Sequence, residues 1–236
     1  MIYAGTSGWA YPAWKPAFYP AKLASAKFLG YYASRLNSTE VNYTFRRFPT
    51  AKLLEGWVAA TPAQFKFAIK AHQSITHIKR LREAGESAGK FIAALQPLRE
   101  ANRLGPVLFQ LPPFLKCDPT RLKDFLAELP KEQRVAFEFR DAAWFCDEIY
   151  GLLRAANAAL CLAESEKLET PSVQTADFCY LRLRDPEKLT SAKARNELLL
   201  RVQQFARSGD VFAYFKHEDS PEGALNAEEL LAKAGA

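Results

Sequence analysis

The sequence predicts an α/β protein that folds as a single (β/α)8 TIM-type barrel over residues 1–236. Eight short segments carry the alternating or continuous apolar pattern of β-strands. Helical spacing separates nearly all of them, and alternation of strands with helices implies a parallel sheet. Eight such units favour closure into a barrel. The main alternative is an open doubly wound sheet, but no G-x-G-x-x-G motif follows the first strand.

The first part of the chain is expected to hold two strands and two helices. Residues 2–9 form a short strand that ends in a glycine-flanked turn, and prolines exclude regular structure from the loop 11–19. Apolar residues at helical spacing predict a helix over 24–36, and 39–45 is the second strand. Thr50 is the expected N-cap of a helix that stops before a Thr-Pro pair.

The middle of the chain repeats the same order. Residues 65–70 alternate between apolar and polar side chains and form the third strand. A polar segment over 72–87 leads to a helix near 88–101. Residues 105–111 form the fourth strand, which a Pro-Pro pair ends. Asp118 is followed by proline, the residue favoured in the first turn of a helix, so the next helix begins there.

The last part is expected to hold four strands and three helices. In 134–140 the apolar residues fall on one side and the polar residues, including a carboxylate and a guanidinium, on the other. A helix that precedes Gly209 has a favourable stop signal. The remaining segments are strands at 158–163, 178–183 and 211–216 and helices at 147–156, 190–207 and 221–233.

Composition excludes some classes of protein. With 49% hydrophobic and 25% charged residues, the chain can bury a core. Its net charge of +6 suits an anionic ligand or nucleic acid. No apolar run approaches the ~18 residues of a membrane span, and no signal peptide is visible. The four cysteines match neither a zinc site nor a disulfide framework, so the expected compartment is the cytoplasm.

Polar side chains gather near the carboxyl ends of the expected strands. If the apolar faces pack outward on the helices, the opposite faces point into the barrel. Barrel enzymes keep their active sites at this end, so we expect the substrate site there. The residues placed together are Ser7, Glu40, Asn42, Lys70, Gln110, Glu138, Arg140, Arg182 and Lys216, with Arg184 just beyond.

Five cations in this set outnumber its two carboxylates, an excess of three positive charges that should attract a phosphate, sulfate or carboxylate. We expect catalytic roles for Glu138, Glu40 and Lys70. The residues expected to bind substrate are Arg140, Arg182, Asn42, Gln110, Ser7, Trp9, Trp144 and Lys216. The alternative is an ion-pair network that merely closes the barrel mouth, although burial of so many charges is costly.

Other side chains near this face have two interpretations each. Trp9 and Trp144 stack on a sugar or base, or they pack beneath their loops.

One of the histidines, His72, His77 or His217, is a candidate acid or base. The surplus of Lys and Arg argues against a resident metal ion, and no cofactor is expected.

Several motifs occur in a fixed order along the chain. They are Gly5-Thr-Ser-Gly-Trp9, Glu40-Val-Asn-Tyr-Thr-Phe45, Phe65-Lys-Phe-Ala-Ile-Lys70, Gln110-Leu-Pro-Pro113 and Phe137-Glu-Phe-Arg-Asp141 with Trp144. Together they resemble the YecE-like family, a domain of unknown function, over nearly the whole chain. The resemblance implies a TIM-type barrel. It implies no reaction, because the activity of that family is not established.

The function expected first is a cytoplasmic barrel enzyme of hydrolase or isomerase type that acts on a small phosphorylated or otherwise anionic molecule. Redox chemistry fits less well without a dinucleotide fingerprint. The alternatives are a nucleic-acid-binding or nucleic-acid-processing protein and a barrel that binds a metabolite without converting it. No membrane partner is expected.

Overall fold

The computed structural model describes residues 1–164, 168–184, 191–215 and 220–235. Its strands are all parallel and follow the order β1-β8-β7-β6-β5-β4-β3-β2. They are β1 (Ile2–Thr6), β2 (Ser38–Val41), β3 (Lys66–Lys70), β4 (Leu104–Gln110), β5 (Val135–Glu138), β6 (Ala159–Ala163), β7 (Phe178–Leu183) and β8 (Asp210–Phe215). The predicted TIM-type barrel is therefore confirmed.

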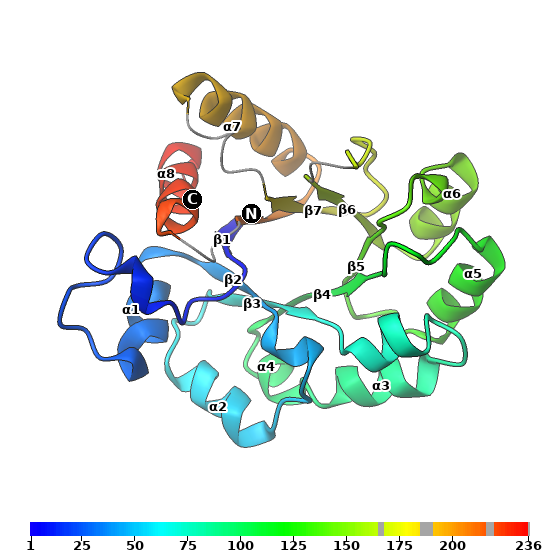
Figure 1. Ribbon diagram of the computed structural model, residues 1–236, viewed down its shortest axis with the longest axis horizontal. Helices are drawn as coiled ribbons and strands as arrows, with labels where there is room; N and C mark the ends of the chain where they lie inside the picture. Colours follow the sequence, from blue (N-terminus) through cyan, green and yellow to red (C-terminus); the bar gives the residue numbers. More distant parts are fainter. Residues whose placement is uncertain (165–167, 185–190, 216–219, 236) are drawn as a thin grey trace.

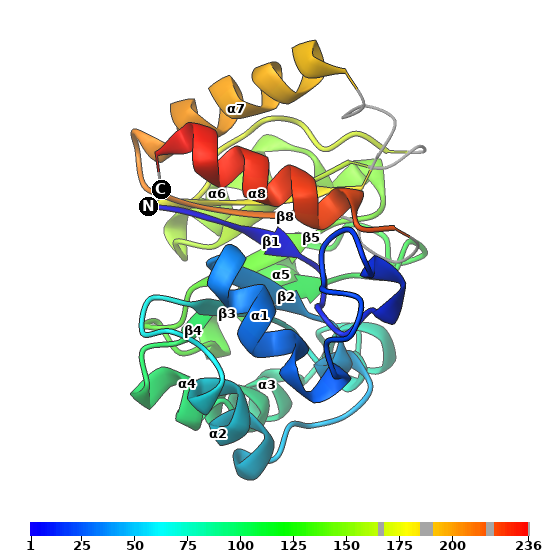
Figure 2. The same cartoon turned by 90° about the vertical axis from the view of Figure 1, so that its left-hand side faces the viewer.

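Helices surround the strands on the outside (Figure 1). Within the described residues they are α1 (Phe28–Arg35), α2 (Ala51–Ala59), α3 (Gly85–Ala93), α4 (Gln96–Glu100), α5 (Pro119–Glu128), α6 (Asp147–Ala155), α7 (Ala192–Ala206) and α8 (Glu222–Ala234). Seen from the side, both chain ends lie where β1 begins (Figure 2). None of the helices in the described ranges has the length and apolar character that a membrane crossing requires.

The predicted N-cap at Thr50 is present, and Asp118 caps the helix that was expected to begin there. The Thr50 hydroxyl accepts a hydrogen bond from the backbone N–H of Leu53, and the Asp118 carboxylate accepts one from that of Arg121. Each cap satisfies one of the N–H groups that the first turn of a helix leaves without a partner.

Several predicted elements were too long, among them the strand of 134–140, which ends at Glu138, and the helix of 24–36, whose α-helical part is Phe28–Arg35. Two others differ in a way that changes the architecture. The strand expected over 39–45 ends at Val41, and a 3-10 turn, Tyr43–Phe45, follows it because the Thr44 hydroxyl donates to the Lys70 carbonyl at 2.7 Å. The helix expected near 88–101 is divided into α3 and α4. Pro97 lies in the first turn of α4, where its missing N–H costs least, and it cannot continue an earlier helix.

Side chains on the two faces of the strands divide the core as the alternation predicted. Phe67, Phe109 and Phe137 pack outward in the layer shared with the helices. Inside the barrel, small side chains on β3, β5 and β6 leave space for aromatic rings from β7 and β8. This inner layer consists of Ala68, Leu108, Ala136, Ala159, Cys161, Ala163, Phe178, Tyr180, Phe212 and Tyr214.

Side chains rather than a backbone ladder join β1 to β2. The Asn37 amide donates to the Ile2 carbonyl at 2.8 Å and accepts from the Ala4 N–H at 2.9 Å. The Tyr32 hydroxyl accepts from the Thr6 N–H at 2.8 Å. These bonds give partners to backbone N–H and C=O groups of β1 that an incomplete barrel would otherwise leave unpaired.

Gly5 permits the close approach of β1 to β2. A Cβ atom at this position would lie 1.8 Å from the Ser38 carbonyl oxygen. The Thr39 hydroxyl donates to the Thr6 carbonyl at 3.0 Å across the same contact between β1 and β2, here termed the seam. The seam therefore needs a residue without a side chain at position 5.

Candidate functional site

A buried ion-pair cluster lies above the aromatic layer of the barrel. The Arg182 guanidinium donates through Nη2 to Glu40 Oε1 at 2.6 Å and through Nη1 to Glu138 Oε2. The Tyr180 hydroxyl donates to Glu40 Oε2 at 2.8 Å. Because strand register places the small residue Ala163 beside Arg182, the guanidinium fits inside the barrel.

Three more polar side chains connect this cluster to the barrel mouth. Gln110 Nε2 donates to Glu138 Oε1 at 2.8 Å, and Arg140 Nε donates to the same oxygen at 3.0 Å. Lys70 Nζ donates to Gln110 Oε1 at 2.7 Å. An amide suits the position between the ammonium and the carboxylate, because it accepts at one atom and donates at the other.

The arginines hold both buried carboxylates in their charged form. Burial alone would raise the pKa of Glu138 and of Glu40, but Arg182 and Arg184 outweigh it, so both pKa values lie below the usual range. The two carboxylates in turn raise the pKa of Arg182 against the effect of burial. All three groups are therefore ionised near neutral pH.

The pKa of Lys70 is lowered, in contrast to that of the other buried cation, Arg182. Burial and the neighbouring Arg182 lower its pKa to about 8. The Lys70 ammonium also lies 4.4 Å from the centre of the Phe45 ring. At pH 7 about a tenth of Lys70 is consequently a free amine, far more than for an unperturbed lysine.

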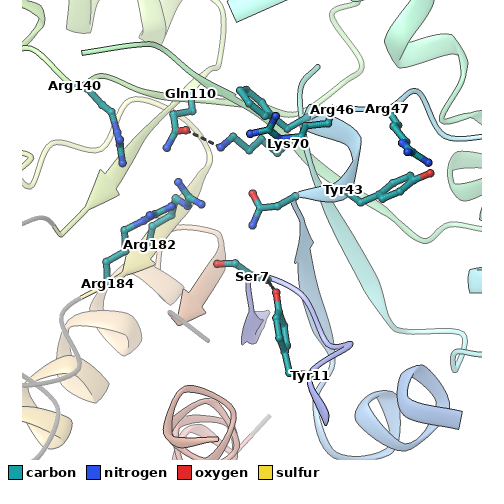
Figure 3. A pocket seen from close by; sticks show the side chains of 12 residues that line it. Ser7, Tyr11, Tyr43, Arg46, Arg47, Lys70, Gln110, Arg140, Arg182 and Arg184 are labelled. Atoms are coloured by element: carbon teal, nitrogen blue, oxygen red, sulfur yellow. Dashed lines mark hydrogen bonds between the residues drawn. The ribbon is translucent and has the colours of Figure 1, made fainter. Parts of the chain in front are cut away.

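A cavity of about 550 Å³ opens over this cluster. Six basic side chains contribute to its wall, and among the described residues that line it there is no carboxylate (Figure 3). The lining residues are Ser7, Tyr11, Asn42, Tyr43, Phe45, Arg46, Arg47, Lys70, Gln110, Arg140, Arg182 and Arg184.

Most of the site residues predicted from the sequence meet here. Six of those predicted to be catalytic or substrate-binding line the cavity, and Arg184 joins them. Glu40 and Glu138 lie beneath them and are 0% and 1% exposed. Lys216 and His217 lie outside the described residues. The residues that line the cavity are Ser7, Asn42, Lys70, Gln110, Arg140 and Arg182.

Trp144 and Trp9 belong to packing layers rather than to the cavity wall. Trp144 is fully buried, stacks on Phe139 at 4.7 Å and donates from Nε1 to the Leu115 carbonyl at 2.9 Å. Trp9 makes an edge contact with Trp57 at 5.4 Å. Both rings pack in the outer layer shared with the helices, and neither lines the cavity.

The turn after β2 supplies site residues that the sequence did not indicate. Tyr43, Phe45, Arg46 and Arg47 line the cavity. An extended strand over 39–45 would have carried both arginines away from the barrel axis. The signal that could have found them is the adjacent pair of arginines directly after a strand end.

Of the two histidines that the structure describes, only His77 contacts a residue of the cavity wall. His77 packs against Phe45 at 4.9 Å, and burial together with Lys70 and Arg140 lowers its pKa. His72 is held by Ser74 at 2.8 Å. Within the described ranges, no group of three or more His, Cys, Asp or Glu side chains is arranged to hold a metal ion.

Comparisons with known proteins fit this architecture. The chain is 32% identical over 160 residues to UPF0759 protein YunF of Bacillus subtilis, covering 64% of this chain and 54% of YunF. It is 30% identical over 146 residues to UPF0759 protein YecE of Escherichia coli K12, covering 61% of this chain and 50% of YecE. The chain thus spans about half the length of the curated relatives it matches.

Solved structures match over the whole chain. A DUF72 family protein from Thermotoga maritima has a TM-score of 0.85 and 25% identity, with 100% of both chains covered. A DUF72 family protein from Enterococcus faecalis has a TM-score of 0.78 and 17% identity, covering 100% of this chain and 98% of its own. The model of DUF72, described as a protein of unknown function, matches residues 3–236. The resemblance seen in the sequence is confirmed, and the chain belongs to the DUF72 family.

Proposed function

We propose that this protein is a barrel enzyme of hydrolase or isomerase type that acts on a small phosphorylated or otherwise anionic molecule. The observation that carries the proposal is the cavity wall, where six basic side chains and no carboxylate are found among the described residues. Such a wall attracts anions, and arginine matches the geometry of phosphate and carboxylate oxygens.

The charge balance of the empty site supports an anionic ligand. Glu40 and Glu138 both pair with Arg182, and Glu138 also pairs with Arg140, so these two carboxylates face the six basic side chains of the wall. Burial and Arg182 together lower the pKa of Arg184, so its charged form is disfavoured there. A bound anion relieves this repulsion, because it supplies the opposite charge at short range.

Lys70 is the group we assign to proton transfer. A base works best when its pKa lies near the working pH, and that of Lys70 is about 8. Catalytic roles for Glu40 and Glu138 stay predictions. Since both are ionised and hold Arg182, we assign them the task of orienting Arg182 and, through Gln110, Lys70.

A thermal-shift screen tests the proposal. Wild type and Arg140→Ala are compared with inorganic phosphate, sulfate, sugar phosphates and divalent metals. A ligand at a hundred times its Kd stabilises the folded state by about 2.7 kcal/mol. We expect anions to stabilise wild type and Arg140→Ala to lose most of that shift, because Arg140 is 37% exposed at the wall.

Arg207→Ala is the matched control, since it removes an exposed arginine after α7, at the opposite end of the barrel. It should keep the full shift. The proposal is wrong if no anion stabilises wild type, or if Arg140→Ala responds as strongly as the control. A ligand that binds without being converted would favour a metabolite-binding barrel instead.

A second basic cavity favours one alternative, a nucleic-acid-binding protein. This cavity of about 430 Å³ lies in the loops after β3 and β4. Phe114 beside it is 59% exposed, and the Arg80 guanidinium lies 5.0 Å from its ring. Exposed rings and cations together suit stacked bases and phosphates. Its basic residues are Lys79, Arg80, Arg82, Lys116 and Arg121.

The salt dependence of oligonucleotide binding tests the nucleic-acid-binding alternative. Affinity for a single-stranded oligonucleotide should fall steeply with rising salt if several phosphates are neutralised. Binding should also weaken in Phe114→Ala, which removes the exposed ring. An absent or salt-insensitive interaction removes the alternative.

A further inference from the structure

Five of the six basic side chains of the main cavity form two groups on opposite sides, and Lys70 lies between them (Figure 3). Arg140, Arg182 and Arg184 lie together on one side, here termed the inner group. Arg46 and Arg47 come from the other side, here termed the outer group, with Arg47 beside Tyr43 (Figure 3). From this division we infer that the substrate carries two anionic groups joined by a hydroxyl-bearing segment, as in a sugar bisphosphate. The inference rests on the proposed function and names its substrate class.

The inner group is built to receive one anion. Arg182 lies on β7, whereas Arg184 directly follows β7 and Arg140 lies two residues after β5. Glu40 and Glu138 fix Arg182 from below. The Nε atoms of Arg182 and Arg184 are buried and have no hydrogen-bond partner among the described residues. Buried donors without partners are costly, and the oxygens of a phosphate supply acceptors for them.

The outer group has no counter-charge of its own. Neither Arg46 nor Arg47 forms an ion pair with a described residue, and both are exposed. The Thr44 hydroxyl fixes the turn that carries them by donating to the Lys70 carbonyl at 2.7 Å. An anion held by the inner group does not neutralise the charges of Arg46 and Arg47, whereas a second anion does.

Neutral hydrogen-bonding side chains lie between the two groups. The Ser7 side chain points toward the middle of the cavity, and Gln110 lies across from it (Figure 3). The Asn42 Oδ1 atom is buried and accepts no hydrogen bond from a described residue. Because hydroxyl groups both donate and accept, a polyol segment satisfies this acceptor together with the neighbouring groups.

Calorimetric titration of the full chain with matched sugar phosphates tests the inference. The probes are fructose 6-phosphate and fructose 1,6-bisphosphate, glucose 6-phosphate and glucose 1,6-bisphosphate, and inorganic phosphate. In wild type we expect each bisphosphate to bind at least about tenfold more tightly than its monophosphate, because charge-assisted bonds form at both ends.

Variants locate the second anion. Arg46→Ala combined with Arg47→Ala should bring the ratio of the two affinities close to one, whereas Arg140→Ala should weaken both ligands by a similar factor. The charge-matched control combines Arg154→Ala with Arg207→Ala, two exposed arginines that follow or end helices at the opposite end of the barrel. It should keep the wild-type ratio, so that loss of net charge alone is excluded as the cause.

Two outcomes overturn the inference, and they differ from failure of the proposed function. Equal affinities for mono- and bisphosphates in wild type mean that one anion suffices. An unchanged ratio in the Arg46/Arg47 double variant means that the outer group does not hold a second anion. In both cases the proposed function stands. If none of the probes binds, including inorganic phosphate, the proposed function and the inference fail together.

Discussion

Arg182 replaces apolar packing at the point where barrel interiors are usually filled by aliphatic side chains. The desolvation cost of burying its guanidinium is offset only while both carboxylates remain. Removal of one partner from a buried ion pair costs about 3–5 kcal/mol. We therefore expect Glu138→Ala to lower the free energy of unfolding by about this amount. Urea denaturation measures it.

Two further variants identify the cause of that loss. Glu138→Gln keeps the volume and part of the hydrogen bonding, so it should lose less stability than Glu138→Ala. Glu86→Ala removes a carboxylate that pairs with Lys90 on an exposed surface, and its stability should stay close to that of wild type. Equal losses in Glu138→Ala and Glu86→Ala would show that the buried cluster contributes nothing special.

Lys70 offers a second prediction, on its titration. Its acylation by a trace of an amine-reactive reagent, followed by peptide mass spectrometry, should rise with pH and level off around pH 8–9, because its pKa is about 8. A lysine model peptide with pKa about 10.4 keeps gaining reactivity above that range. Bound phosphate should move the Lys70 curve to higher pH, since a nearby anion favours the ammonium. Parallel curves for Lys70 and the peptide would exclude the shift.

Among the elements, the seam between β1 and β2 is the part of the barrel most dependent on single residues. Gly5→Ala would place a Cβ atom 1.8 Å from the Ser38 carbonyl oxygen, a backbone atom that cannot move without opening the seam. We expect a loss of at least about 1–3 kcal/mol, the range for overpacked sites. Thermal and urea unfolding both measure it.

Gly56→Ala is the matched control for this substitution. A Cβ atom at Gly56, within α2, meets nothing within 4 Å. Alanine is a better helix former than glycine by about 0.5–1 kcal/mol, so this variant should be as stable as wild type or more stable. If both variants are stabilised, the strands must be able to separate at the seam without cost.

The turn after β2 is the element that determines the outer side of the cavity. Thr44 fixes it to β3, and Arg46 and Arg47 project from it. Because the turn is joined to Lys70 through the backbone, a shift of the turn also moves the proposed proton acceptor. Under the proposed function, this short segment links substrate selection to proton transfer.

For the whole molecule, the buried carboxylates predict how stability depends on pH. Their pKa values are lower in the folded state than in the unfolded chain, where a glutamate titrates near about 4.3. Between these values the unfolded chain binds more protons. Stability from the cluster is therefore complete above about pH 5 and is lost as the pH falls through the folded values.

Urea denaturation at several pH values between 7 and 3 tests this dependence. Wild type should lose stability steadily below about pH 5. Glu138→Gln should begin less stable at pH 7 but show a shallower decline, because one of the two titrating groups is gone. Identical slopes in the two proteins would mean that other carboxylates dominate acid unfolding.

The sequence by itself determined the barrel, the inward face of each strand and the set of polar residues at the strand ends. These follow from the period-two alternation of apolar residues, a local property that any strand buried on one side must carry. The residues expected near the strand ends that line one cavity in the structure are Ser7, Asn42, Lys70, Gln110, Arg140 and Arg182, and their roles stay predictions.

Only the tertiary structure decided how those charges pair and which loops complete the site. Glu40, Glu138 and Arg182 come from β2, β5 and β7, and their contacts span up to 142 positions of sequence, so no local pattern encodes them. The turn that brings Arg46 and Arg47 to the cavity depends on a hydrogen bond from Thr44 to β3. Trp144 is buried because its loop folds back over Phe139. Long-range packing, rather than periodicity, fixes these positions.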